Sequence, residues 1–240
     1  MGRLIPAYFN WSGGKDSTLA LYKALRENQF DIRYLLTTFN EEADRISMHG
    51  VRRELLISQA ESIGIPVKMV HLPSGSDMQG YENAMNQAIR ELKSEGISDC
   101  IFGDIFLEDL RTYREQKLKE AGISAHFPLW KRETDELIRE FVDLGFKTVV
   151  VCTDSSKLND TFAGRIIDRN FIADLPENVD PCGENGEFHT FVFDGPVFKT
   201  PVSFELGEKV HKTYPATNAR NEAIEYRFCF QDLIPVYPRI

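Results

Sequence analysis

The chain has 240 residues, of which 42% are hydrophobic and 27% carry charge. These fractions are typical of a soluble globular protein, and the length suffices for one large α/β domain or for a medium domain with a smaller one. The formal net charge of −9 argues against general binding to nucleic acid, because that affinity comes from Lys and Arg side chains.

Cysteine usage and hydropathy indicate the compartment. No C-x-x-C pair or zinc-finger spacing connects the four cysteines, which are Cys100, Cys152, Cys182 and Cys229. We expect buried free thiols in a reducing compartment. The N-terminus lacks the apolar stretch of a signal peptide, and no apolar run approaches the roughly 18 residues of a membrane span. We therefore expect a cytoplasmic protein without a membrane partner.

The first half of the chain alternates short apolar runs with amphipathic stretches. The patterns predict strands at 6–11, 32–39, 67–72 and 98–106, and helices at 17–28, 51–63, 81–94 and 108–121. This alternation predicts an α/β fold with a parallel sheet and helices on both faces. Ligands of such sheets bind beyond the carboxyl ends of the strands.

The second half of the chain differs from the first in composition and in its predicted elements. A helix at 134–144 and a strand at 148–153 are followed by a region rich in Pro, Gly and Phe, where 187–193 and 197–204 read as antiparallel strands. We expect two domains, with residues 1–125 forming the first. Residues 126–240 then form a smaller mixed α/β domain with antiparallel strands.

One loop between the first strand and the first helix is suited to phosphate. It reads Ser12, Gly13, Gly14, Lys15, Asp16 and Ser17. Adjacent glycines let backbone N–H groups approach an anion, and the helix N-terminus adds donors and a positive dipole end. The hydroxyls and Lys15 add further donors. Asp16 would be repelled by phosphate unless it held a metal ion or a backbone turn.

The loop is not a Walker A motif, because Phe9 stands where that motif needs its first Gly. It resembles the pyrophosphate loop of the N-type ATP pyrophosphatases, a superfamily that includes GMP synthetase, NAD synthetase, asparagine synthetase and tRNA-thiolating enzymes. The resemblance implies a HUP-type domain that binds ATP with Mg²⁺ and holds the departing pyrophosphate, with Lys15 as a catalytic cation.

Further blocks narrow the resemblance. Residues 48–52, 103–106, 128–130, 180–191 and 194–196 resemble the diphthine–ammonia ligase family. The family converts the diphthine carboxylate of elongation factor 2 to an amide with ATP and ammonia. The segment after Asp104 differs from the family's Gln-Arg-containing segment, so the implied acceptor is diphthine or an analogous carboxylate.

A second group of candidate residues surrounds a predicted turn. Asn185 and Gly186 favour a tight hairpin turn, since both tolerate positive φ. In a strand that starts at Glu187, that residue and His189 share one face, and Glu184 lies across the turn. These three side chains are candidates to bind ammonium or take a proton from ammonia. The alternative is that the glutamates are solvated and the histidine is structural.

Strand ends supply the remaining candidates. Asp104 lies at the carboxyl end of a predicted strand and could hold a metal or orient the substrate, or it could cap the next helix. Its neighbour Gly103 is grouped with the ATP-binding residues. Thr38 and Phe39 end the strand beside the first and could hold adenine, or they could have capping and core roles. His49 could reach ATP from its loop. Asp16 and Asp104 are the candidate Mg²⁺ ligands.

The combined hypothesis is an AMP-forming carboxylate–ammonia ligase. A carboxylate attacks the α-phosphorus of ATP, pyrophosphate leaves into the loop, and free ammonia displaces AMP. One alternative is a tRNA-thiolating enzyme with the same loop, which predicts a basic surface and paired cysteines. Another is a non-catalytic ATP-binding regulator. Phe-rich hairpins with exposed edges could form a dimer surface, so the sequence leaves a homodimer open.

Overall fold

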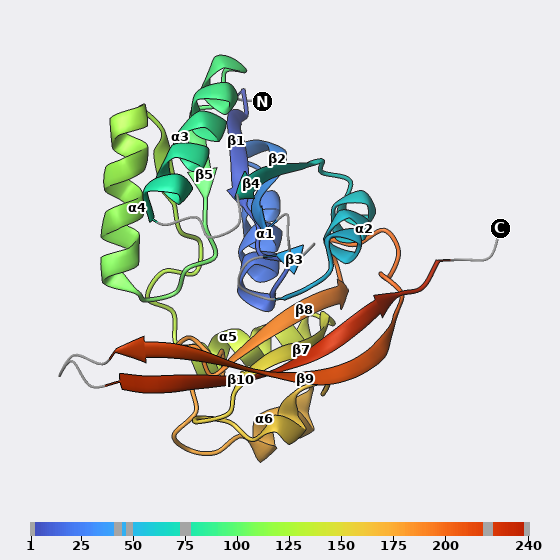
Figure 1. The fold of residues 1–240 in the computed structure, drawn as a ribbon. Coiled ribbons are helices and arrows are strands. Elements are labelled where there is room, and N and C mark those ends of the chain that lie inside the picture. The colour runs from blue at the N-terminus through green and yellow to red at the C-terminus, as the bar shows by residue number, and fades with distance from the viewer. Residues whose placement is uncertain (1–2, 41–44, 47–49, 73–77, 218–222, 238–240) are drawn as a thin grey trace.

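The computed structural model describes residues 3–40, 45–46, 50–72, 78–217 and 223–237, which form two sheets with their helices (Figure 1). The first ten elements, in chain order, are β1 (Ile5–Asn10), α1 (Lys15–Glu27), β2 (Phe30–Asn40), β3 (Arg45–Ile46), α2 (Arg53–Ile63), β4 (Val67–Leu72), α3 (Met78–Ser94), β5 (Asp99–Ile101), α4 (Glu108–Ala121) and β6 (Ser124–His126). The remaining elements are α5 (Thr134–Asp143), β7 (Lys147–Asp154), the 3-10 helix η1 (Asp160–Phe162), α6 (Arg169–Asp174), β8 (Phe188–Asp194), β9 (Phe204–Thr217) and β10 (Ala223–Pro235).

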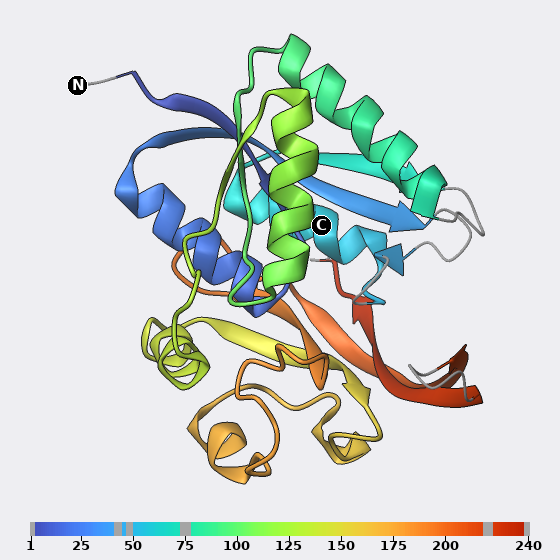
Figure 2. The ribbon, with the colours of Figure 1, turned by 90° about the vertical axis from the view of Figure 1, so that its left-hand side faces the viewer.

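The first sheet confirms the predicted α/β fold. Its parallel strands run in the order β4-β2-β1-β5-β6, and short β3 pairs antiparallel with the end of β2. Helices α3 and α4 lie side by side on one face, while α1 and α2 cover the other (Figures 1 and 2). Successive side chains of β1 point to opposite faces of the sheet. Tyr8 packs against α3 and α4 on one face, and Phe9 packs against α1 on the other.

The second sheet is antiparallel, in the order β8-β7-β10-β9. It does not have a wholly separate core. Leu19 of α1 belongs to the same buried cluster as Phe141 of α5, Phe171 of α6 and Phe188 of β8. Helix α1 thus packs between the sheets, and the phosphate loop at its N-terminus meets β8. The division into 1–125 and 126–240 stays a prediction, and β6 ends one residue beyond it.

Three sequence predictions about strands were wrong. The predicted strand at 197–204 is irregular, since Pro196 and Pro201 lie within or beside it, and β9 begins only at Phe204. Asn185 and Gly186 form a turn with no strand before it, so β8 pairs with β7 instead of closing a hairpin. The predicted strand at 98–106 shortens to β5. The long β9–β10 hairpin was missed, although Ile224, Tyr226, Phe228 and Phe230 occupy every second position of β10. Most of the described side chains of the hairpin are exposed.

Two expectations on composition can be compared with the structure. All four cysteines are buried free thiols, which confirms the prediction for Cys100 and Cys152, the two that lie in apolar runs of the sequence. Over the described ranges, every helix is too short or too polar to cross a bilayer.

Candidate active site

The phosphate loop (residues 12–17) is closed by its own side chains. Ser12 Oγ donates to Ser17 Oγ at 2.9 Å and accepts from the backbone N–H of Gly14 at 3.3 Å. The Ser17 and Thr18 hydroxyls both contact the carbonyl oxygen of Gly14, at 2.9 and 2.8 Å. These contacts hold the loop as a turn around the first residues of α1, where helix N–H groups have no intrahelical partner.

Two glycines are required by close approach. Gly13 has φ of 77°, and a Cβ there would lie 2.6 Å from the Gln59 side-chain oxygen. A Cβ on Gly103 would lie 2.8 Å from the backbone of Ser17. Gly103 therefore lets the segment after β5 approach the first residues of α1 closely. The next residue in the chain, Asp104, then lies near the phosphate loop.

Gln59 of α2 supports the loop from beneath, and the sequence analysis missed it. Its Nε2 donates to the carbonyl oxygens of Gly13 at 3.0 Å and Val192 at 2.5 Å, and its Oε1 accepts from the Trp11 indole at 3.3 Å. The side chain is fully buried. A buried amide with all these partners fixes the loop against β8. Gln59 could have been found from the sequence, because it is an amide on the otherwise apolar inward face of the predicted helix at 51–63.

Strand β8 contacts the loop through one face. The backbone N–H of Lys15 donates to Thr190 Oγ1 at 3.0 Å, and that of Val192 donates to the carbonyl of Gly13 at 3.0 Å. Lys15 Nζ lies 5.5 Å from the centre of the Phe188 ring. Thr190 was also missed, since nothing local in the sequence distinguishes it.

The loop carries opposed charges in a buried setting. Lys15 is only 4% exposed, and its Nζ lies 2.7 Å from Asp16 Oδ2. Burial lowers the pKa of Lys15, but Asp16 and, less strongly, Glu184 raise it, and the net pKa is above the usual value. The ammonium group is therefore charged at neutral pH and available to a phosphate.

Glu184 reaches the loop from the second sheet's side of the molecule. Burial, followed by the Asp16 charge, raises the pKa of Glu184 to about 7, against the opposing effects of Lys15 and the backbone N–H groups of Ile105 and Phe106. A carboxyl with a pKa near 7 can both take and give a proton at neutral pH. The structure thus brings Glu184 together with Lys15 and Asp16, although about two thirds of the sequence separates Glu184 from these two residues.

Residues 180–187 form the loop that carries Glu184. Backbone N–H groups of this loop donate hydrogen bonds to two other carboxylates, those of Asp180 and Glu187. Asp180 Oδ1 accepts from the backbone N–H groups of Cys182 at 2.8 Å and Glu184 at 3.1 Å. Glu187 is 3% exposed and accepts from the backbone N–H groups of Asn185 at 2.9 Å and Asp180 at 3.2 Å. Glu187 is thus not solvated, and its carboxylate oxygens accept hydrogen bonds from its own loop.

His189 stands apart from this group. Strand alternation places it with Phe191, on the face opposite Phe188 and Thr190, which meet the phosphate loop. Sequence reasoning had grouped Glu184, Glu187 and His189, and of these Glu184 acts on the pKa of Lys15.

The predicted adenine residues have mixed placements. Phe39 is 3% exposed and packs edge-on against His71, with ring centres 5.8 Å apart, so its ring is a core contact. Thr38 is half-buried in the last part of β2. His49 lies outside the described residues.

Asp104 joins the loop to a neighbouring helix. Its carboxylate accepts a hydrogen bond from Arg114 of α4. Burial raises the pKa of Asp104 above its usual value, with Asp16 adding to the increase and Arg114 opposing it. Helix α4 begins after Leu107 without a side-chain cap, so Asp104 does not cap it. The two carboxylates supply the oxygen donors that Mg²⁺ prefers, although each is paired with a cation, Asp16 with Lys15 and Asp104 with Arg114. Their role as metal ligands stays a prediction.

A cavity of about 430 Å³ opens between α3 and α4, past the end of β1. Apolar side chains form most of its wall, including Tyr81, Met85 and Phe102, while Asn10 and Arg114 add polar groups. Arg114 also binds Asp104, so one residue of the cavity wall contacts a candidate site residue.

Comparison with known proteins gives two matches to family models. Residues 7–125 match the Diphthamide synthase N-terminal domain, and residues 133–219 match the Diphthamide synthase C-terminal domain. Relatives named diphthine–ammonia ligase include those of Homo sapiens (22% identical over 83% of this chain and 82% of that protein) and Danio rerio (24%, 83% and 86%). The relative from Saccharomyces cerevisiae is 25% identical over 78% of this chain and 33% of that protein.

Among solved structures, the U34-tRNA thiolase of Methanococcus maripaludis is 19% identical, covering 60% of this chain and 59% of that chain with a TM-score of 0.38, which is too low to support an argument. The two domain matches together span most of the sequence, in the order expected of one protein. The chain belongs to the diphthamide synthase family.

Proposed function

We propose that this protein is an ATP-dependent ligase that adenylates a substrate carboxylate and transfers ammonia to it, releasing AMP and pyrophosphate. The proposed acceptor is diphthine on elongation factor 2 or an analogous carboxylate. The observation that carries the proposal is the position of Glu184, a carboxyl with a pKa of about 7, beside Lys15 of the phosphate loop. Family membership supports the same chemistry.

The phosphate loop would bind the part of ATP that leaves. Attack of the acceptor carboxylate oxygen on the α-phosphorus breaks the bond to the β-phosphate oxygen and forms an acyl-adenylate. Lys15 and the N–H groups at the start of α1 offset the charge that grows on the pyrophosphate. Asp16 and Asp104 would hold Mg²⁺, which supplies additional neutralisation of the phosphate charge when bound.

Glu184 is proposed to act in the second step. Ammonia attacks the acyl carbon, AMP departs, and the nitrogen must lose one proton to give the neutral amide. Glu184 accepts this proton, and its raised pKa suits a base at neutral pH. The attraction between Lys15 and ionised Glu184 keeps the carboxylate near the phosphate loop.

The acceptor is proposed to occupy the cavity between α3 and α4. Its apolar walls suit a side chain with an aliphatic stem, and Arg114 offers a cation to a carboxylate. Arg114 also contacts Asp104, so an acceptor bound there would lie next to the proposed metal ligands.

The two alternatives from the sequence are weaker. The thiolase alternative needs accessible paired cysteines. Cys152 and Cys229 lie on neighbouring strands, but all four thiols are buried. A non-catalytic regulator has no need of a carboxyl with a pKa near 7 beside its phosphate loop.

Product analysis tests the proposal. The purified protein is incubated with ATP, Mg²⁺ and ammonium, with and without elongation factor 2 carrying diphthine. The ligase predicts AMP and pyrophosphate in amounts equal to the amide formed, and only when acceptor and ammonium are both present. ADP as the nucleotide product would exclude the mechanism, and bound ATP that persists in every mixture would favour the regulator.

A further inference from the structure

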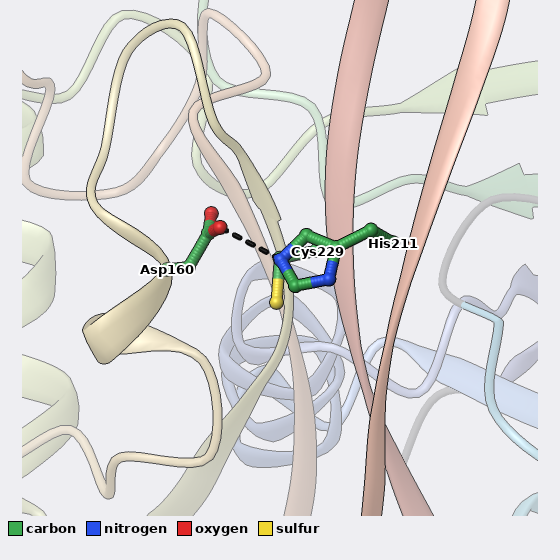
Figure 3. A group of neighbouring side chains, drawn as sticks. All are labelled: Asp160, His211 and Cys229. Atoms are coloured by element: carbon green, nitrogen blue, oxygen red, sulfur yellow. Dashed lines mark hydrogen bonds and ion pairs between the residues drawn. The ribbon is translucent and has the colours of Figure 1, made fainter.

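Three potential metal ligands meet on the β9–β10 hairpin, away from the phosphate loop. They are Asp160 of η1, His211 of β9 and Cys229 of β10 (Figure 3). One ligand atom from each lies within 4.8 Å of the other two. The side chains point toward one another from three separate segments of the chain. None of them belongs to the proposed ligase machinery.

The backbone fixes this convergence. His211 and Cys229 are direct partners in the antiparallel register of β9 and β10, so their side chains share one face of the hairpin. Asp160 lies against that face, and its Oδ2 is 2.8 Å from His211 Nε2. Ser155 Oγ donates to Asp160 Oδ1 at 2.7 Å, which orients the carboxylate as the outer partners of metal ligands do.

We propose that Asp160, His211 and Cys229 form a binding site for a zinc ion. Oxygen, nitrogen and sulfur donors together suit this borderline-soft divalent ion, whereas Mg²⁺ and Ca²⁺ prefer oxygen alone. The alternative to a metal site is a simple surface ion pair between Asp160 and His211. Such a pair does not explain why a cysteine thiol lies next to it. Here Cys229 lies fully buried at the base, while the His211 side chain is 64% exposed.

The three protein ligands leave a fourth tetrahedral position on the solvent side, which water would fill. Zinc binds the thiolate, so the Cys229 proton is released to solvent as the metal–sulfur bond forms. His211 binds as the neutral ring through Nε2, the nitrogen that already faces Asp160.

A zinc ion here would join the hairpin to the segment of residues 155–160. That segment already contacts β10 through the Ser155 N–H to the Arg227 carbonyl at 2.8 Å, and β9 through Lys209 to the Asp160 carbonyl at 2.9 Å. It also reaches the Glu184 loop, because Lys157 Nζ donates to the carbonyl of Asn185 at 2.6 Å. We infer a structural role in which the metal stabilises the support of the 180–187 loop.

Metal titration of the full chain tests the site. Protein stripped with a chelator is titrated with Zn²⁺ against a chromogenic competitor, and separately with Co²⁺, whose absorption reports sulfur ligation. We expect one Zn²⁺ per chain, a sulfur-to-cobalt charge-transfer band and a higher melting temperature with Zn²⁺. His211→Gln and Cys229→Ala should each weaken Zn²⁺ binding by about tenfold or more.

Controls separate the site from general effects. Cys100→Ala removes another buried thiol, in the first sheet, and should leave Zn²⁺ affinity and the cobalt band unchanged. His211→Gln changes an exposed side chain, so its circular dichroism should match that of the wild type. A wild type that binds no Zn²⁺, a cobalt spectrum without the sulfur band, or Cys229→Ala protein that binds as tightly as Cys100→Ala would each overturn the proposal.

Discussion

The hydroxyl of Thr190 accepts a hydrogen bond from the backbone N–H of Lys15 at 3.0 Å, across 175 residues of sequence. Both groups are buried, and the contact fastens the start of α1 to β8. The phosphate loop is therefore built by both halves of the chain. Its shape depends on how the two sheets pack.

Removing this acceptor should weaken folding and ATP binding together. Thr190→Val keeps the shape but leaves the Lys15 N–H buried without its partner, at a cost of about 1–3 kcal/mol in the free energy of unfolding. Thr190→Ser keeps the hydroxyl and is the matched control. Urea denaturation and ATP titration would compare the two variants. Equal stability for both would contradict a role for the hydrogen bond.

Lys15→Ala should reduce AMP formation by a factor on the order of 10² to 10³, because one preorganised donor to the leaving group is lost. Lys15→Arg retains the charge and should retain more activity. The rate of AMP release at saturating ATP is the measurement, with binding checked separately. A wild-type rate in the Ala variant would remove Lys15 from the mechanism.

The pKa of Glu184, raised to about 7, predicts a pH-dependent rate. The base works when deprotonated, so at a constant concentration of free ammonia the amide-forming rate should rise with pH through about 7 and then level off. Glu184→Gln should abolish this rise along with most of the activity. A pH profile of amide formation from pH 5.5 to 8.5 would measure it, and a rise that persists in the variant would assign the base elsewhere.

The same substitution should have the opposite effect on stability. A carboxyl whose pKa is raised by folding stabilises the protein below its unfolded pKa, about 4.3, and this stabilisation is lost as pH rises through about 7. Glu184→Gln removes the cost of ionising the buried group. The variant should therefore gain melting temperature relative to the wild type at pH 8 more than at pH 5. An equal difference at both pH values would show that the group does not titrate in this range.

Glu187 should behave differently from Glu184, although they are three residues apart. Its oxygens accept N–H groups from Asp180 and Asn185, and the amide of Glu187→Gln can replace only one of these acceptors. We expect a loss of about 1–3 kcal/mol in the free energy of unfolding. The residual activity should keep the midpoint of the wild-type pH profile. A shifted midpoint would point to a direct role for Glu187 in proton transfer.

The cavity between α3 and α4 should control acceptor binding. Met85→Trp adds bulk to a cavity wall and should raise the KM for the acceptor by about tenfold or more, the effect of roughly 1.4 kcal/mol, without changing ATP affinity. Steady-state kinetics with the acceptor varied at saturating ATP would show it. Gln87→Leu on the same helix, which does not line the cavity, is the control. An unchanged KM in Met85→Trp protein would place the acceptor elsewhere.

The sequence by itself determined the phosphate loop and the parallel sheet. The loop's chemistry is local, since a strand end, two glycines and a helix start follow one another along the chain. Strand–helix alternation fixes the sheet in the same way, because each element buries its own apolar face.

Only the tertiary structure decided which distant groups join the loop. Alternation divides β8 into two faces, with His189 on one and Thr190 on the other, but it does not say which face meets Lys15. Likewise, the turn near Asn185 placed Glu184 and Glu187 together, yet contacts with buried N–H groups and with Asp16 gave them different roles. Those contacts come from the packing of two sheets around α1, an interaction between residues far apart in sequence that no local pattern records.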